Sequence, residues 1–178
     1  LLLNRGKDIP VHVPVLLEEV LEYLDPKPGD VIVDATVGAG GHARRILELL
    51  NNKGLYIAVD KDEEVLKETK ERLSQFEDVC RFFHADYAFM DEILEQAGVS
   101  HADAFLFDLG VLTDQIRDPE RGFSYMENGP LDMRLNRNSS LTAYDVVNRY
   151  TSEQLAEIFS QYGDARYPER IAEAVVKE

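Results

Sequence analysis

The apolar residues of this 178-residue chain fall into short continuous runs, with stretches of helical spacing between them. Short apolar runs bounded by turn signals predict buried strands, whereas apolar residues three and four positions apart predict amphipathic helices. Strands are predicted over residues 31–33, 55–59, 79–83 and 104–107, and helices over 15–24, 42–50, 88–97 and after Asp62. Strands that alternate with helices are typical of a parallel sheet with right-handed crossovers. We therefore predict an α/β fold.

The alternation stops after residue 108. Residues 109–140 have no clear period, and glycine and proline recur in them. A segment of this length without regular structure is usually functional or disordered. Helical segments are then predicted to begin at Thr142, at Thr151 with Gln154 in a capping box, and at Pro168. The pattern thus predicts a sheet domain over residues 1–112, followed by a loop and an inserted helical domain over 113–178.

Composition narrows the class of protein. A hydrophobic share of 44% and a charged share of 30% are typical of a soluble globular protein. A formal net charge of −15 excludes a protein that coats nucleic acid through bulk electrostatics, and no apolar run is long enough to cross a bilayer. The single cysteine, Cys80, is expected in the core and favours a cytoplasmic protein. We expect neither a membrane partner nor a DNA partner.

A glycine-rich turn follows the first predicted strand. Residues 34–42 read Asp-Ala-Thr-Val-Gly-Ala-Gly-Gly-His, and glycine both accepts unusual backbone angles and lets a ligand approach closely. In an open α/β sheet this turn predicts a small-molecule pocket at the carboxyl end of the strand. Asp34, ahead of the glycines, would hold either an ammonium group or a turn amide.

Two further features suit an adenosine ligand. Asp60 ends the second predicted strand, ~20 residues after Gly40, where an acid accepts hydrogen bonds from a ribose diol. Asp86 and Tyr87 follow the third strand and would flank an adenine with an acceptor and an aromatic face. The glycines are not followed by Lys-Ser/Thr, and their spacing differs from Gly-x-Gly-x-x-Gly. These features favour a phosphate-free adenosine cofactor, of which S-adenosylmethionine is the common one.

Three alternatives stay open at this point: glycines that serve only tight turns, a dinucleotide-dependent oxidoreductase, and a non-catalytic adenosine-binding module. Asp108 ends the fourth predicted strand at the lip of the same pocket. Its carboxylate would orient an amine nucleophile by accepting a hydrogen bond, or would only cap the strand. No histidine has metal-ligand spacing to another histidine or to Cys80, so we predict no metal site.

The motifs together resemble one family, the bacterial 16S ribosomal RNA cytosine-N4 methyltransferases, also called MraW. The most specific matches are Arg-Gly-Phe-Ser at 121–124 and Gly-Pro-Leu-Asp-Met-Arg at 129–134. Further matches lie at residues 12–17, 34–42, 108–111, 162–163 and 170–172. The resemblance implies a Rossmann-like class I methyltransferase sheet with an inserted helical domain. It also implies that S-adenosylmethionine is the cofactor and that the substrate is N4 of a cytidine in 16S rRNA of the small ribosomal subunit.

The resemblance assigns roles to individual residues. Gly40, Gly41 and His42 would line the methionine end of the cofactor. Asp60 would hold the ribose, and Tyr87 would lie beside the adenine. Asp108 and Gln115 would complete the cofactor site, with Asp108 as the catalytic residue.

The chain also departs from the family. Leu112-Thr113 replaces the usual pair of serines, and similar proteins continue well beyond residue 178. The chain does not begin with Met and ends inside a helical pattern. We therefore expect a C-terminally truncated chain that holds the first four strands, has its fourth strand at an exposed edge, and is inactive alone.

RNA contacts are less clearly indicated. Residues 113–140 hold four arginines against five acidic residues, which is no basic patch. Arg121 and Arg134 would contact phosphates or pair with Asp132 and its neighbours. Phe123 and Tyr125 would stack on an extruded base or pin the loop to the core. The sequence leaves a homodimer open.

Overall fold

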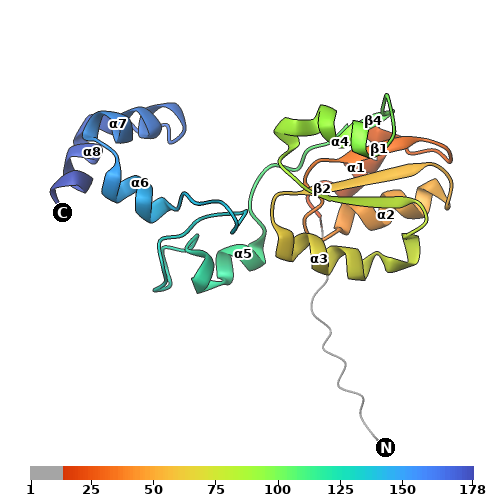
Figure 1. The fold of residues 1–178 in the computed structure, drawn as a ribbon, viewed down its shortest axis with the longest axis horizontal. Coiled ribbons are helices and arrows are strands. Elements are labelled where there is room, and N and C mark those ends of the chain that lie inside the picture. The colour runs from red at the N-terminus through yellow and green to blue at the C-terminus, as the bar shows by residue number, and fades with distance from the viewer. Residues whose placement is uncertain (1–13) are drawn as a thin grey trace, which may run out of the picture. The chain divides into compact units, whose positions relative to one another are not determined.

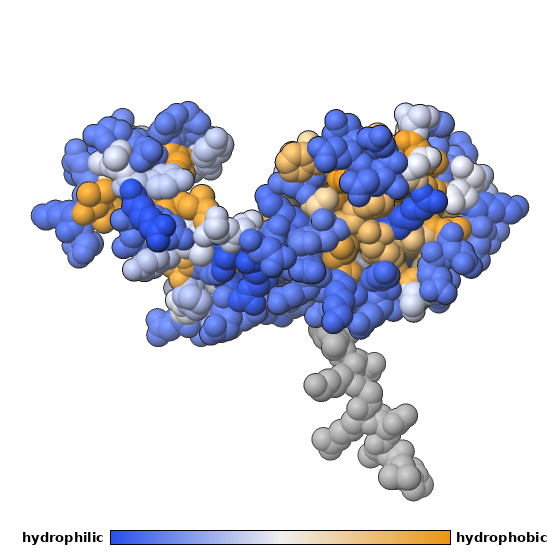
Figure 2. All heavy atoms as spheres, in the orientation of Figure 1, coloured by the Kyte–Doolittle hydropathy of each residue, from blue (hydrophilic) through white to orange (hydrophobic). Residues whose placement is uncertain are grey.

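The computed structural model describes residues 14–178, so residues 12 and 13 of the first family motif lie outside the described residues. The chain divides into two compact units, the first ending at Gly110 and the second running from Val111 to Glu178 (Figure 1). Figure 2 shows hydrophilic side chains over most of the visible surface of both units, with smaller apolar patches on each. Among the described residues, no helix is both long and apolar enough to cross a membrane.

The first unit contains a four-stranded parallel sheet. The strands β1 (Val31–Asp34), β2 (Leu55–Asp60), β3 (Cys80–His84) and β4 (Ala104–Leu106) lie in the order β3-β2-β1-β4. Val33 of β1 pairs with Ile57 on one side and with Phe105 on the other. The chain leaves β1 toward β2 and later returns to its other side, so a topological switch point lies beside β1. The predicted parallel α/β sheet, with its fourth strand at an edge of the described sheet, is confirmed.

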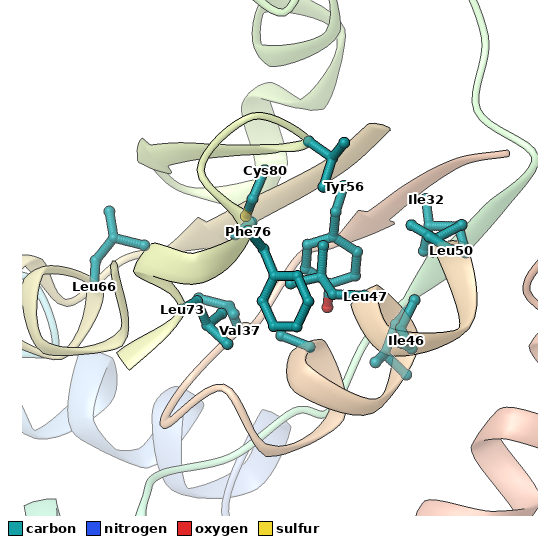
Figure 3. Packing of buried hydrophobic residues seen from close by; sticks show 14 residues of the cluster. Ile32, Val37, Ile46, Leu47, Leu50, Tyr56, Leu66, Leu73, Phe76 and Cys80 are labelled. Atoms are coloured by element: carbon teal, nitrogen blue, oxygen red, sulfur yellow. The ribbon is translucent and has the colours of Figure 1, made fainter. Parts of the chain in front are cut away.

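Helices cover both faces of this sheet (Figure 1). They are α1 (Leu17–Leu24), α2 (Gly41–Leu50), α3 (Glu63–Arg72) and α4 (Met90–Gln96), with single 3₁₀ turns η1 (Ser74–Phe76) and η2 (Tyr87–Phe89). Because side chains alternate along a strand, Ile32 and Tyr56 pack on one face with Leu47 of α2, as Figure 3 shows. Val33 and Ile57 pack on the other face with Ile93 of α4. The core is therefore divided between the two faces.

Element boundaries differ slightly from the predicted ones. The fourth strand ends at Leu106 because β1, its partner, ends at Asp34, which pairs with Leu106. Phe107 therefore has no strand partner. The predicted helix over 88–97 is a 3₁₀ turn followed by α4. Asp62 caps α3, as predicted, because its carboxylate accepts from the backbone amides of Glu64 and Val65.

The second unit is helical. It contains α5 (Thr113–Arg117), the 3₁₀ turn η3 (Pro119–Arg121), α6 (Ala143–Arg149), α7 (Ser152–Gln161) and α8 (Pro168–Lys177). The helix start at Thr142, the capping box at Thr151 and the first-turn Pro168 are confirmed, and Thr142 forms a second capping box with Asp145. Leu155 of α7 and Ala172 of α8 are fully buried. The segment 109–140 is not without structure, because α5 and η3 lie in it; each is too short to produce a visible period.

The Asp62 cap yields a stability prediction. Asp62→Ala removes the acceptor for the first amides of α3 and should lower the free energy of unfolding by about 1 kcal/mol. Asp62→Asn keeps an acceptor at this position and is the matched control. Urea denaturation followed by circular dichroism measures both. Equal stability of Asp62→Ala and wild type would contradict the capping role.

Candidate active site

Three carboxylates meet at the carboxyl edge of the sheet. Asp34 ends β1, Asp60 ends β2, and Asp108 follows shortly after β4. Parallel register brings these ends to the same edge, since Asp34 pairs with Ala58 of β2 and with Leu106 of β4. Burial is the main cause of the raised pKa of Asp34, and the charges of Asp60 and Asp108 raise this pKa further. Like charges gathered at a switch point are typical of a functional site rather than of a structural core.

The glycine turn is bound to Asp60. The Gly38 amide donates to Asp60 Oδ2 at 2.9 Å, and the Asp62 amide donates to Asp60 Oδ1 at 2.9 Å. Thr69 Oγ1 of α3 donates to the Gly38 carbonyl at 2.6 Å, which fixes the turn from its other side. Each carboxylate oxygen has two lone pairs, so Asp60 can still accept from a ligand. Burial is the largest cause of the raised pKa of Asp60.

The turn glycines are required by packing inside the protein. Gly40 has φ of 80°, and a Cβ there would lie 2.8 Å from Thr69 Cγ2. A Cβ at Gly41 would collide with the ring of Pro14. The tight-turn interpretation is thus sufficient for both positions, and their predicted contact with a cofactor stays a prediction.

His42 lies beside Asp108. The ring is buried at the start of α2, and its Nε2 lies 2.9 Å from the Val15 carbonyl oxygen, so this nitrogen carries a hydrogen. Its Nδ1 lies 3.9 Å from Asp108 Oδ2. The Asp108 amide donates to Thr36 Oγ1 at 2.7 Å, and the Asp108 side chain is 48% exposed. Asp108 is therefore held by its backbone while its carboxylate faces solvent.

Asp34 is buried and satisfied by the protein itself. Tyr56 Oη donates to its Oδ2 at 2.6 Å, and the Thr36 amide donates to its Oδ1 at 3.1 Å. The side chain is 1% exposed, which leaves no surface for a ligand's ammonium group, so the turn-amide interpretation is confirmed. Burial raises the pKa of Asp34 to about 7, although both hydrogen bonds act in the opposite direction.

An aromatic contact links the loops that follow the two edge strands. Tyr87 lies beyond β3 and Phe107 beyond β4, yet their ring centroids are 5.7 Å apart in an edge-to-face arrangement. Tyr87 is 43% exposed and so offers ring surface to a ligand. Asp86, predicted as an adenine acceptor, instead accepts from Lys61 Nζ at 2.7 Å and from the Ala88 amide at 3.0 Å, and the bond from Lys61 lowers its pKa.

Gln115 belongs to the second unit. It is buried in α5, and its Oε1 accepts from the Leu112 amide at 2.8 Å. Leucine at the N-cap cannot accept a hydrogen bond from the helix, so Gln115 supplies the interaction that ties the start of α5. This role is local to the second unit, and the predicted role of Gln115 toward a cofactor stays a prediction.

The long loop is held by Arg134. Its guanidinium donates to both carboxylate oxygens of Asp132, at 2.9 and 2.6 Å, and to the carbonyl oxygens of Arg137 and Ser139. The pairing interpretation is therefore confirmed for Arg134, and the ion pair lowers the pKa of Asp132 to about 2. Tyr125 is 96% exposed, so its interpretation as a residue that pins the loop to the core is wrong.

A groove of about 690 Å³ lies elsewhere in the first unit. It runs along α3, η1 and β3 and is lined by residues that include Lys70, Ser74 and Arg81. The glycine turn, Asp60 and Asp108 do not line it. Within the described part of the chain, no cluster of acidic, histidine and cysteine side chains is arranged to hold a metal ion. The candidate site at the carboxyl edge of the sheet is therefore identified by its side chains and backbone amides, and not by this groove.

Comparison with known proteins decides the family. A model of the MraW methylase family matches residues 10–178. The chain belongs to the MraW methylase family. A relative named ribosomal RNA small subunit methyltransferase H, from Caldicellulosiruptor saccharolyticus, is 45% identical over 166 residues, which cover 93% of this chain and 54% of the relative. The protein of the same name from Clostridioides difficile is 44% identical over 167 residues, with 94% and 54% covered.

This MraW methylase family chain spans about half the length of the curated relatives it matches. Among solved structures, a putative rRNA-methylase from Clostridium thermocellum is 24% identical, with a TM-score of 0.49 over 54% of this chain and 52% of the other. Within the first unit, Gly40 caps α2, Gly41 and His42 begin it, Asp60 ends β2, and Asp108 follows β4, so all five lie at the carboxyl edge of the sheet.

Thr36 and Tyr56 were missed by sequence reasoning. Both interact with Asp34, and the sequence pattern predicts for Tyr56 only a place in the apolar strand over residues 55–59. A tyrosine in an otherwise aliphatic buried strand needs a partner for its hydroxyl group. That requirement, applied to the neighbouring strand, would have pointed to Asp34.

The buried Asp34 predicts a pH-dependent stability. Its pKa is 3.8 in an unfolded chain and about 7 here, so between these values the folded protein binds the extra proton. The free energy of unfolding should therefore fall as the pH rises from about 4 to about 7, by an Asp34 contribution of order 2–4 kcal/mol. Asp34→Asn should remove this part of the slope, measured by urea denaturation across the range. The exposed Asp78→Asn is the control, and an unchanged slope in Asp34→Asn would refute the assignment.

Proposed function

We propose that this chain is the cofactor-binding part, with an associated substrate-binding region, of an S-adenosylmethionine-dependent methyltransferase that modifies N4 of a cytidine in 16S rRNA. Membership of the MraW methylase family and relatives named ribosomal RNA small subunit methyltransferase H support the reaction class. The observation that carries the proposal is Asp60, which is bound to the glycine turn and keeps acceptor capacity. It is a ribose-binding group beside a turn that offers no phosphate-binding lysine.

The first unit supplies the groups for the cofactor. Asp60 accepts hydrogen bonds from the ribose, and the half-exposed Tyr87 packs beside the adenine. Gly40, Gly41 and His42 line the methionine end, where α2 begins. Bound S-adenosylmethionine supplies a methyl group on a positively charged sulfur, which is attacked in line. The carboxylates of Asp60 and Asp108 at this edge favour a cation there.

Asp108 faces the acceptor. The lone pair of an exocyclic cytosine amine is delocalised into the ring, so an acceptor that binds its hydrogen turns the lone pair toward the methyl group. Asp108 has the exposure to do this, and its backbone is tied to Thr36. Since methyl transfer of this kind depends on alignment, the protein contributes mainly by holding the reacting groups in place.

The second unit is proposed to hold the RNA in the cytoplasm, within the small ribosomal subunit. The chain's net charge of −15 excludes broad attraction to a polyanion, so a small number of specific contacts must suffice. Tyr125, which is almost fully exposed, offers a ring for base stacking. Arg134 is already engaged by Asp132 and is not assigned to the RNA.

The intact gene product tests the function directly. Small-subunit particles that lack the modification are incubated with the protein and S-adenosylmethionine, and the 16S rRNA is digested and examined by mass spectrometry for N4-methylcytidine. Formation of this nucleoside supports the proposal. Cofactor binding without any methylated nucleoside would instead identify a non-catalytic adenosine-binding module.

Asp60 yields a binding prediction. Asp60→Ala should weaken S-adenosylmethionine binding by about 1–3 kcal/mol through the loss of hydrogen bonds to a charged acceptor. Titration calorimetry measures the change. Asp103→Ala is a matched control, because Asp103 also accepts a backbone amide, that of Val31, but at the amino end of the sheet. If both variants bind like wild type, the ribose assignment is incorrect.

Asp108 yields a kinetic prediction. Asp108→Asn keeps the size of the side chain but weakens the acceptor, so the rate of methyl transfer should fall by about 10- to 100-fold. The Kd for S-adenosylmethionine should change less than threefold, which corresponds to a change in binding free energy of less than ~0.6 kcal/mol. Single-turnover kinetics and calorimetry provide the two values. Equal losses in both would make Asp108 a cofactor ligand alone.

A further inference from the structure

A continuous set of hydrogen bonds runs from the core to Asp108. Tyr56 Oη donates to Asp34 Oδ2 at 2.6 Å, and the Thr36 amide donates to Asp34 Oδ1 at 3.1 Å. The Thr36 hydroxyl oxygen then accepts from the Asp108 amide at 2.7 Å. These residues come from β2, the end of β1, the glycine turn and the segment after β4, so the set joins the two central strands to the segment that follows the edge strand β4.

The register explains why Tyr56 can reach Asp34. Ile32 pairs with Tyr56, and Asp34 pairs with Ala58, so Asp34 and Tyr56 are diagonal neighbours on one face of the sheet. The Tyr56 ring is fully buried among the apolar residues of that face, as Figure 3 shows. A ring held by packing gives its hydroxyl group a fixed position, which in turn fixes the Asp34 carboxylate.

The backbone at Asp108 is not held by strand pairing, so another interaction must fix its position. Strand pairing ends at Leu106, where the Ala35 amide donates to the Leu106 carbonyl at 2.9 Å. Beyond that point, the Asp108 backbone is bound to Thr36, and His42 Nδ1 lies 3.9 Å from the Asp108 carboxylate, beyond hydrogen-bond distance. The Thr36 bond is therefore the short-range constraint on the chain at Asp108.

We propose that Tyr56, Asp34 and Thr36 form a positioning relay that sets the place of Asp108 for the substrate amine. Thr36 acts on Asp108 through its hydroxyl group, and Tyr56 acts on Thr36 through Asp34. None of the three is assigned a contact with substrate or cofactor, so they are positioning residues. The inference rests on the proposed function, because the amine is the group that Asp108 would meet.

The first test replaces the Thr36 hydroxyl in the intact protein. Thr36→Val keeps the shape of the side chain and removes the acceptor, whereas Thr36→Ser keeps the hydroxyl group. Thr36→Val should lower kcat by roughly 10- to 100-fold, the scale of a small misplacement, with less than a threefold change in the Kd for S-adenosylmethionine. Thr36→Ser should recover most of that kcat. A kcat for Thr36→Val equal to that of wild type, or equal losses in both variants, would overturn the relay.

The second test observes Asp108 without catalysis. The amide resonance of Asp108 in a ¹⁵N-labelled protein should shift, and its hydrogen exchange should accelerate, in Thr36→Val and to a smaller extent in Tyr56→Phe. Tyr23→Phe, at an exposed tyrosine of α1, is the control and should leave the resonance unchanged. An unchanged Asp108 amide in Tyr56→Phe would remove Tyr56 from the relay, and an unchanged amide in both variants would overturn the relay.

The two proposals fail separately. Wild-type protein that never methylates cytidine refutes the proposed function, yet the amide measurements would still report whether Tyr56 and Thr36 act on Asp108. Conversely, an active wild type with unaffected Thr36→Val and Tyr56→Phe variants refutes the relay alone.

Discussion

The parallel pairing of β1 with β2 on one side and β4 on the other is the constraint on which the site depends. Asp34 ends β1, Asp60 ends β2, and Asp108 lies two residues after β4. Parallel register places these three carboxylates at one edge of the sheet. Such a concentration of negative charge costs free energy in a folded protein. The protein limits this cost with hydrogen bonds: backbone amides donate to Asp34 and Asp60, and Tyr56 adds its hydroxyl group. The same bonds make the geometry rigid.

The glycine turn serves this arrangement in two ways. Gly38 brings an amide to Asp60, and the missing side chain of Gly40 lets α3 pack closely enough for Thr69 to hold the turn. The glycines that predict a ligand site are therefore also required for packing inside the protein. Ligand binding and packing would both select glycine at these positions, so the sequence pattern alone does not separate the two roles.

The sheet of the first unit and helix caps in both units could be predicted from the sequence. Buried strands and amphipathic helices leave strong periodic signals, and Asp62, Thr142 and Thr151 act locally, so their caps follow from a few neighbouring residues. Contacts between distant segments could not be predicted in this way. The bond from Tyr56 to Asp34 depends on register, and the contact of Tyr87 with Phe107 depends on loops that leave opposite edges of the sheet. The start of the short helix α5 is tied by the Leu112 amide, which donates to Gln115 Oε1, rather than marked by a repeating pattern.

The contact between Tyr87 and Phe107 joins the two ends of the proposed pocket. Phe107 directly precedes Asp108 in the chain, so the Tyr87 ring contacts the residue next to the proposed substrate-binding carboxylate. An adenine that packs against Tyr87 would thus contact a ring that itself contacts Phe107, next to Asp108. If Tyr87 and Asp108 act as proposed, the placement of the cofactor and that of the substrate amine would therefore be linked through this one pair of rings.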